Sequence, residues 1–280
     1  MIRREIVGGH ALILQHDHAR LAAQLAQHLP ATARPSERVL RAIAMHDAGW
    51  PIHDAQPTLN AQGLPLDVFE SPPEVVLPCW EQSVLLAAGD DPYAGLLVSV
   101  HVLKLSSLAA SKAHDRQAVF DLNCFQHRQI ELQTTLRSKL GLRIDIPVKL
   151  GLAVQRGIAA EEQLRWDYAM LSAMDSLSLA LLCSQVPFDQ IELPGRRGAK
   201  PIALRFAAHR DGLALDPWPF AAPSINLTVP CKCLPSRPYA TLAAFHAEYA
   251  AAPPAALDLC IEPAAPGTGT AGTARPTRPL

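Results

Sequence analysis

The chain has 280 residues, of which 49% are hydrophobic and 18% charged, with 25 Lys and Arg against 26 Asp and Glu. This composition supports one substantial core, and the net charge of −1 excludes a general electrostatic attraction to nucleic acid or to an anionic membrane. No apolar run approaches the roughly 18 residues of a membrane span, and the N-terminus lacks the apolar core of a secretory signal. A soluble cytoplasmic protein is therefore expected. Six cysteines without regular spacing indicate no disulfide framework.

The first part of the chain predicts a hairpin followed by helices. Residues 4–15 read as two short strands around a Gly-Gly turn. Apolar residues at helical spacing then predict six helices, at 17–29, 35–47, 81–89, 91–110, 114–141 and 159–185. Residues 49–78 are rich in Pro, Gly, Asn and Asp and carry little periodicity, which predicts a long loop of the kind that often covers a functional site.

After residue 186 the pattern changes to short alternating segments between Gly, Pro and Asp turns. Residues 187–250 predict a small β-rich extension that ends in a short helix. Residues 251–280, dominated by Pro, Ala, Gly and Thr, predict a disordered tail. The expected fold class is therefore mainly α. It comprises a helical domain over 1–186 with an N-terminal hairpin, and a small C-terminal antiparallel β unit packed on it.

Four of the predicted helices carry ionisable residues on or beside the apolar stripe that should face the core. These residues are His18, the pair His46 and Asp47, His101, and Asp175. Burial of such a group is costly unless it is paired, hydrogen-bonded or bound to a metal. Asp175 is the least expected, because it lies in the most apolar helix of the chain. Imidazole and carboxylate ligands together suit a divalent ion of the series Mn, Fe, Co, Ni, Zn or Mg.

Each of these residues also has an ordinary structural explanation. A single histidine in an apolar helix, such as His101, is usually a hydrogen-bonded core residue. Asp175 could cap a neighbouring helix or pair with an arginine, and a protonated His46 would be favourable at the end of a helix. The metal hypothesis therefore depends on several such residues occurring together, in a particular chain order.

That order, His then His-Asp then Asp on successive helices, resembles the HD superfamily of metal-dependent phosphohydrolases. The segments "QHDHARLAAQLA", "AIAMHDAGW", "HDAQP", "DPYAGLLVSVHVLKL" and "QLRWDYAMLSAMDSLSLAL" together resemble a mainly bacterial family catalogued as a domain of unknown function and grouped with the HD-like folds. The similarity spans roughly residues 1–230. It implies an HD-like helical bundle.

The resemblance also implies a set of metal ligands: His18, His46, Asp47 and Asp175. His101 matches a position where some HD proteins place a histidine for a second metal. A complete second set of histidines is not visible, so one divalent ion is favoured over two. The loop at 49–78 departs from the general HD pattern.

The function that this resemblance implies is that of a metal-dependent phosphohydrolase acting on a small phosphoester or nucleotide. Asp47 would both hold the ion and orient the attacking water. Lys104, one turn beyond His101, is the best candidate for a cation that binds phosphate, although a solvated lysine is the simpler explanation. Asp54 is expected to accept a hydrogen bond from a ligand histidine. The alternative is a non-catalytic, HD-like ligand-binding or regulatory protein.

Overall fold

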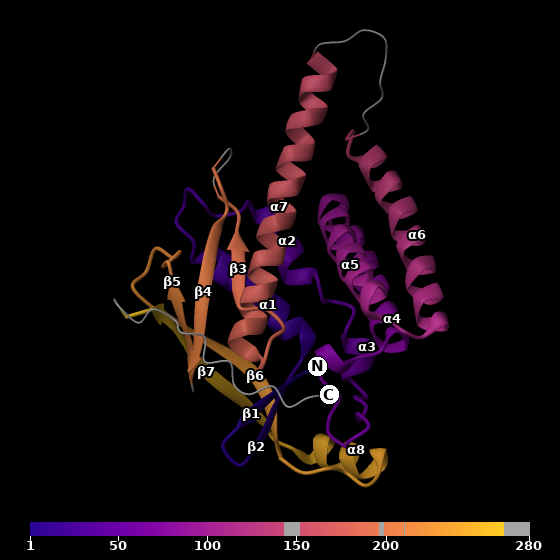
Figure 1. The fold of residues 1–280 in the computed structure, drawn as a ribbon, viewed down its shortest axis with the longest axis vertical. Coiled ribbons are helices and arrows are strands. Elements are labelled where there is room, and N and C mark those ends of the chain that lie inside the picture. The colour runs from indigo at the N-terminus through magenta and orange to yellow at the C-terminus, as the bar shows by residue number, and fades with distance from the viewer. Residues whose placement is uncertain (143–151, 196–198, 210, 266–280) are drawn as a thin grey trace.

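The computed structural model describes residues 1–142, 152–195, 199–209 and 211–265. In this part of the chain a group of helices lies beside a curled seven-stranded sheet, and the long helix α7 runs between the two (Figure 1). About 51% of the described residues are helical and 20% are in strands. The prediction of a mainly α bundle was therefore wrong, because the sheet is a full layer of the fold and not a small appendage.

The helices account for most of the predicted apolar stripes. They are α1 (Gln15–Gln27), α2 (Glu37–Met45), α3 (Pro51–Asp54), the 3-10 helix η1 (Val68–Glu70), α4 (Pro73–Asp90), α5 (Pro92–Lys112), α6 (Arg116–Lys139), α7 (Leu152–Leu182) and α8 (Leu242–Ala251). Asp91 ends α4 and its side chain caps α5 by accepting a hydrogen bond from the Tyr93 N–H. Helix α1 packs on α2 and α7, and α5 packs on α2, α4, α6 and α7. The main core extends from the junction of α1, α2, α5 and α7 to the buried residues of the strands.

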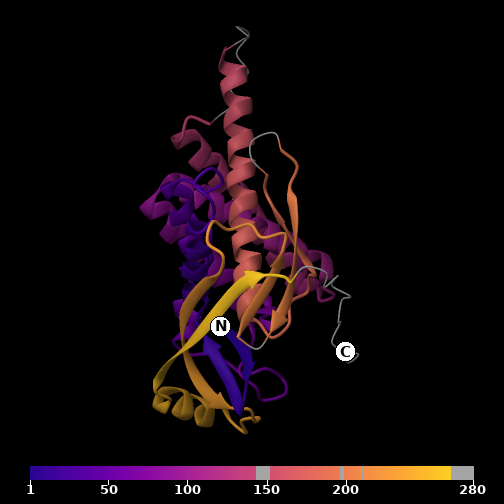
Figure 2. The ribbon, with the colours of Figure 1, turned by 90° about the vertical axis from the view of Figure 1, so that its left-hand side faces the viewer.

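The sheet brings together strands from both ends of the chain. They are β1 (Ile2–Ile6), β2 (Gly9–Ile13), β3 (Gln190–Leu193), β4 (Ile202–His209), β5 (Gly212–Asp216), β6 (Ile225–Pro235) and β7 (Pro254–Pro263). Their order is β1-β2-β6-β7-β5-β4-β3, and β5 with β7 is the parallel pair among otherwise antiparallel neighbours. Hairpin β1–β2 joins the sheet through β6, with Leu12 opposite Lys232. Figure 2 shows the sheet curling around one side of α7.

The prediction of a disordered tail over residues 251–280 was wrong for the part that forms strand β7. Residues 254–263, which we expected to be disordered, pair with β6 on one side and β5 on the other. The strand alternates, and Leu259 and Ile261 are buried. Gly212 of β5 makes the close approach feasible, since a side chain there would collide with the Cys260 carbonyl oxygen. Residues 266–280 of the predicted tail lie outside the described residues.

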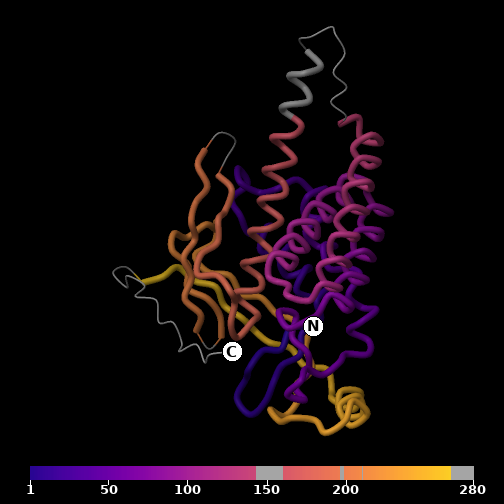
Figure 3. Tube along the Cα trace, turned by 45° about the vertical axis from the view of Figure 1, so that its right-hand side comes forward, coloured from indigo at the N-terminus to yellow at the C-terminus, as the bar shows by residue number. Residues whose placement is uncertain are grey.

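The predicted loop at 49–78 is largely structured. Helix α3 occupies its start, Leu59 bridges to Pro65, and α4 begins at Pro73, a residue type that suits the first turn of a helix. Helix α8 lies against this segment at the foot of the molecule (Figure 3), where His246 Nε2 is 2.8 Å from the Pro57 carbonyl oxygen. The segment is thus packed into the fold.

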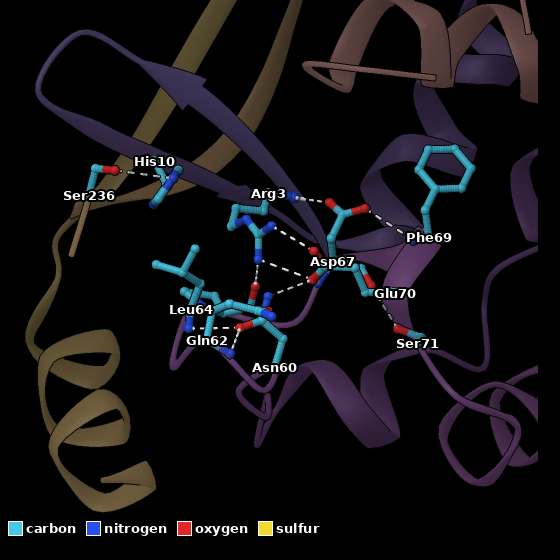
Figure 4. A network of polar contacts seen from close by, with 11 residues as sticks. Arg3, His10, Asn60, Gln62, Leu64, Asp67, Phe69, Glu70, Ser71 and Ser236 are labelled. Atoms are coloured by element: carbon cyan, nitrogen blue, oxygen red, sulfur yellow. Dashed lines mark hydrogen bonds and ion pairs between the residues drawn. The ribbon is translucent and has the colours of Figure 1, made fainter. Parts of the chain in front are cut away.

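A polar network fixes the segment to β1 (Figure 4). The Arg3 guanidinium donates to the Glu70 carboxylate at 2.9 Å, and Asn60 donates to the same carboxylate at 3.0 Å. The Arg3 N–H donates to Asp67 at 2.8 Å, and the next N–H on that side of β1, from Glu5, donates to Ser184 at 2.7 Å. Strand β1 is therefore bound on its outer side by side chains.

Helix α5 is the one helix in the described ranges that is long and apolar enough to cross a membrane. Half of its apolar window is buried inside the fold, between α4, α6, α2 and α7. A core helix of this kind passes the same length and composition test, so it is weak support for a membrane span.

Candidate metal centre

Five of the ionisable residues singled out in the sequence meet at the junction of α1, α2, α5 and α7. His18 is the fourth residue of α1, His46 and Asp47 directly follow the last residue of α2, His101 lies on α5, and Asp175 lies on α7. All five are buried, with exposed fractions between 1% for the two histidines His18 and His46 and 8% for Asp175. The helix packing thus places three imidazoles and two carboxylates in the core.

Four ligand atoms point at a common centre. The Nε2 atoms of His18 and His46 are 3.1 Å apart. The Asp175 Oδ1 atom lies 3.1 Å from the first and 3.4 Å from the second. The Asp47 Oδ2 atom lies 3.6 Å from both. By the spacing of their ligand atoms, two overlapping groups could hold an ion: His18, His46 and Asp47, and His46, His101 and Asp175.

These spacings fit the edges of a metal coordination shell. With ligand bonds of about 2.1 Å, neighbouring ligand atoms are roughly 3.0 Å apart in an octahedron and roughly 3.4 Å apart in a tetrahedron. The distances from the two histidine Nε2 atoms to each other and to the two carboxylates, 3.1 to 3.6 Å, cover this range with a small excess. The residues therefore fit a divalent ion both in chemistry and in spacing.

The outer nitrogens of the two histidines fix their protonation. His46 Nδ1 lies 2.7 Å from the Ile43 carbonyl oxygen, which can only accept a hydrogen bond, so Nδ1 carries a proton. The Ser178 hydroxyl donates its one hydrogen to the Asp175 carbonyl oxygen at 2.9 Å, so it accepts from His18 Nδ1 at 2.7 Å. In their neutral forms, both imidazoles thus present an unprotonated Nε2 to the centre.

The charge balance of the quartet favours a cation at its centre. Burial opposes ionisation of Asp175, but hydrogen bonds from His18 and His46 hold the pKa of its carboxyl well below the usual range. Burial also lowers the pKa of His46, yet Asp47 and Asp175 overcome this and raise it to about 9. Burial raises the pKa of Asp47 against the attraction of the histidines. A proton or a metal ion is stabilised here.

His101 adds a third imidazole on the far side of Asp175. Its Nε2 lies 3.6 Å from Asp175 Oδ2, and its ring stands edge-on to that of His46, with centroids 5.3 Å apart. Burial lowers the pKa of His101 to about 4, so the ring is neutral. Asp175 therefore offers one oxygen to the quartet and the other to His101.

Two other predicted residues lie elsewhere. Asp54 is buried but accepts from the Gln15 N–H at 2.9 Å and pairs with the Met1 amino group at 3.0 Å, so its described polar partners include no quartet histidine. Lys104 is exposed on α5, away from the buried quartet. The Trp50 ring is buried and lies edge-on to His53.

Ser178 contacts the quartet through His18 and is the residue of this cluster that sequence reasoning missed. It lies three residues after Asp175 on α7, on a neighbouring face of the helix, and it is fully buried. That spacing was visible in the sequence. Several serines are interspersed along this apolar helix, however, and nothing in the pattern marked Ser178 as the partner of a histidine on α1.

A family model with the description "Protein of unknown function (DUF3891)" matches residues 1–236, which include the whole quartet. No curated protein and no solved structure matches the chain.

Proposed function

The chain belongs to the family described as "Protein of unknown function (DUF3891)", and we propose that this member is a metal-dependent phosphohydrolase. Its ion would be held by the quartet His18, His46, Asp47 and Asp175. The substrate would be a small phosphoester. The order of these residues on the helices, which resembles that of the HD phosphohydrolases, is the reason for choosing phosphoester chemistry.

One observation carries the metal part of the proposal. Two imidazole Nε2 atoms lie 3.1 Å apart, and each outer nitrogen is committed as a donor to Ile43 or to Ser178. When both histidines are neutral, the two Nε2 atoms and the two carboxylates repel one another at such distances unless a proton or a metal ion lies between them. A divalent ion satisfies all four at once.

The residues of the quartet would then have separate tasks. A divalent ion supplies Lewis-acid chemistry, since it lowers the pKa of water and polarises a phosphoryl oxygen. His18 and His46 hold it through nitrogens whose orientation is fixed from behind. Asp47 holds it from the end of α2 and orients a water for attack. Asp175 is shared with the neutral His101, which keeps its second oxygen in place.

Burial of the quartet restricts the substrate. The carboxylates are its more exposed members, with 11% of the Asp175 side chain and 8% of the Asp47 side chain accessible. A phosphoryl group would have to approach from their side. Lys104 is exposed, so the negative charge of the phosphate would be neutralised by the metal ion itself.

The near-complete burial of the quartet also favours a second candidate, a metal-binding protein without catalytic activity. Structural metal sites are closed, whereas catalytic sites keep a position open for substrate. The two candidates share the ion and differ in turnover.

Metal analysis and a substrate screen test the proposal. Purified protein and its His46→Ala and Asp175→Ala variants would be loaded with Mn, Fe, Co, Ni, Zn or Mg and their bound metal quantified. Exposed Asp258→Asn on β7 is the matched carboxylate control. We expect about one ion in the wild type and the control, little in the two variants, and metal-dependent hydrolysis of phosphomonoesters or phosphodiesters. A folded wild type that binds none of these metals would refute the site, and bound metal without turnover would support the second candidate.

A further inference from the structure

A stripe of polar residues on α7 leads from the surface to Asp175. Tyr168 and Ser172 precede Asp175 by seven and three residues, so all three lie on one face of the helix. Tyr168 and Ser172 are half-buried, whereas Asp175 is 8% exposed. Exposed Arg165 stands one turn before Tyr168, at the outer end of the same face. Polar groups thus continue from the rim of the fold to the metal centre.

The Tyr168 phenol lies within electrostatic reach of the centre. Burial raises its pKa, the Ser172 hydroxyl lowers it, and the Asp175 carboxylate raises it again. Tyr168 therefore interacts with Ser172 and with Asp175, which lies two helical turns further along α7. Other residues of α7 face elsewhere: the Trp166 indole donates to the Gly195 carbonyl oxygen beside the sheet. The stripe therefore differs in direction from the face of α7 that packs beside the sheet.

We propose that Tyr168 and Ser172 contact the organic group of the substrate while its phosphoryl group lies at the quartet. This inference rests on the proposed function. With a rise of about 1.5 Å per residue, Ser172 stands about 4.5 Å and Tyr168 about 10 Å along the helix from Asp175. Two hydroxyls at these positions suit a phosphate ester of a short, hydroxyl-bearing alcohol, whose own hydroxyls can donate and accept. Arg165 attracts the anion at the entrance.

A matched pair of ligands that resist hydrolysis tests this inference. Binding of 3,4-dihydroxybutylphosphonate and of butylphosphonate to the manganese-loaded protein would be measured by calorimetry. The two probes share a length and an anionic group and differ in the two hydroxyls. We expect the wild type to bind the dihydroxy probe roughly fivefold to tenfold more tightly, as one or two hydrogen bonds allow. Tyr168→Phe and Ser172→Ala should each reduce this ratio towards one, and Ser172→Thr should retain most of it.

Controls separate this inference from the proposed function. Tyr239→Phe and Ser111→Ala remove hydroxyls away from α7 and should leave the ratio unchanged. Manganese content is measured for every variant, so failure to bind the ion would refute the proposed function and this inference with it. Two results would refute the contacts proposed for Tyr168 and Ser172 without affecting the metal centre. The first is a wild type with normal manganese content and equal affinity for the two probes. The second is an unchanged affinity ratio in both the Tyr168→Phe and the Ser172→Ala variant.

Discussion

The metal quartet and the network around Arg3 each contain two carboxylates, but the negative charges of these carboxylates are compensated differently in the two clusters. In the network of Figure 4, Glu70 accepts from the Arg3 guanidinium and from Asn60, and Asp67 accepts backbone N–H groups. Every acceptor there has a donor supplied by the chain. In the quartet, one oxygen of each carboxylate lies within 3.6 Å of both histidine Nε2 atoms, which are themselves 3.1 Å apart.

This difference separates a structural cluster from a binding site. The Arg3 network is partly exposed and complete, so it can stabilise the packing of residues 59–70 on β1 without any added component. The quartet is buried and lacks a fixed cation among the residues described, so it is stabilised only when a proton or an ion arrives. Substitutions in the quartet should therefore reduce metal binding, whereas substitutions in the Arg3 network should reduce stability and leave metal binding unchanged.

The largest effect is expected from Asp175→Ala. This change removes the carboxylate that touches both histidines and His101, and should lower divalent-metal affinity by more than about 100-fold, the upper range for loss of an outer partner alone. Competition with a chelating dye measures it. Glu70→Gln is the paired control and should bind metal normally. Equal metal affinity in Asp175→Ala and wild type would remove the distinction between the two clusters.

The pH dependence of stability should also distinguish them. The pKa of His46, about 9 in the folded protein against an ordinary value of 6.5, is raised. The stabilisation from its protonation is thus fully present below pH 6.5 and is lost as the pH rises to 9. For the metal-free protein this amounts to about 3 kcal/mol. Urea unfolding in a chelator measures it, and added metal should flatten the profile. A flat profile without metal would contradict the role of His46.

A smaller effect is expected from Ser178→Ala. Loss of this hydroxyl frees the His18 ring to rotate and to change tautomer, which should weaken metal binding roughly 10- to 100-fold. Ser178→Thr, which keeps the hydroxyl, should recover part of the affinity. If Ser178→Ala binds metal as tightly as the wild type, His18 is oriented by packing alone.

The smallest effect should come from the Arg3 network. Glu70→Gln weakens a partly exposed ion pair and should lower the free energy of unfolding by about 0.5 to 1 kcal/mol, with metal content unchanged. Thermal unfolding at two salt concentrations measures it. A loss of bound metal in Glu70→Gln would show that the two clusters are coupled.

The convergence of the quartet could be anticipated because His18 and Asp175 occupy helix positions whose direction is set by local periodicity, and His46 and Asp47 directly follow the last residue of α2. His18 lies on the same face of its helix as Leu21 and Leu25, and Asp175 lies one turn from Leu171. Ligand geometry could not be anticipated, since it depends on how α1, α2, α5 and α7 pack. For the same reason Asp54, assigned to a histidine by its place in the chain, was found with Gln15 and the Met1 amino group.

The sheet was underestimated for a different physical reason. Strand pairing depends on partners far apart in the chain, such as β2 with β6, and no local pattern specifies them. Strand β7 was hidden by its composition, because two prolines and several alanines masked the alternation of Leu257, Leu259 and Ile261. Alternation was therefore a better guide there than residue type.

The side-chain partners of β1 have a consequence for association between copies of the protein. A sheet edge with unpaired N–H groups is a template for a strand from another molecule, and this is a common route to aggregation. The outward N–H groups of Arg3 and Glu5 are already occupied by Asp67 and Ser184. Intermolecular strand pairing along β1 would first have to break these bonds, so this end of the sheet is protected against growth.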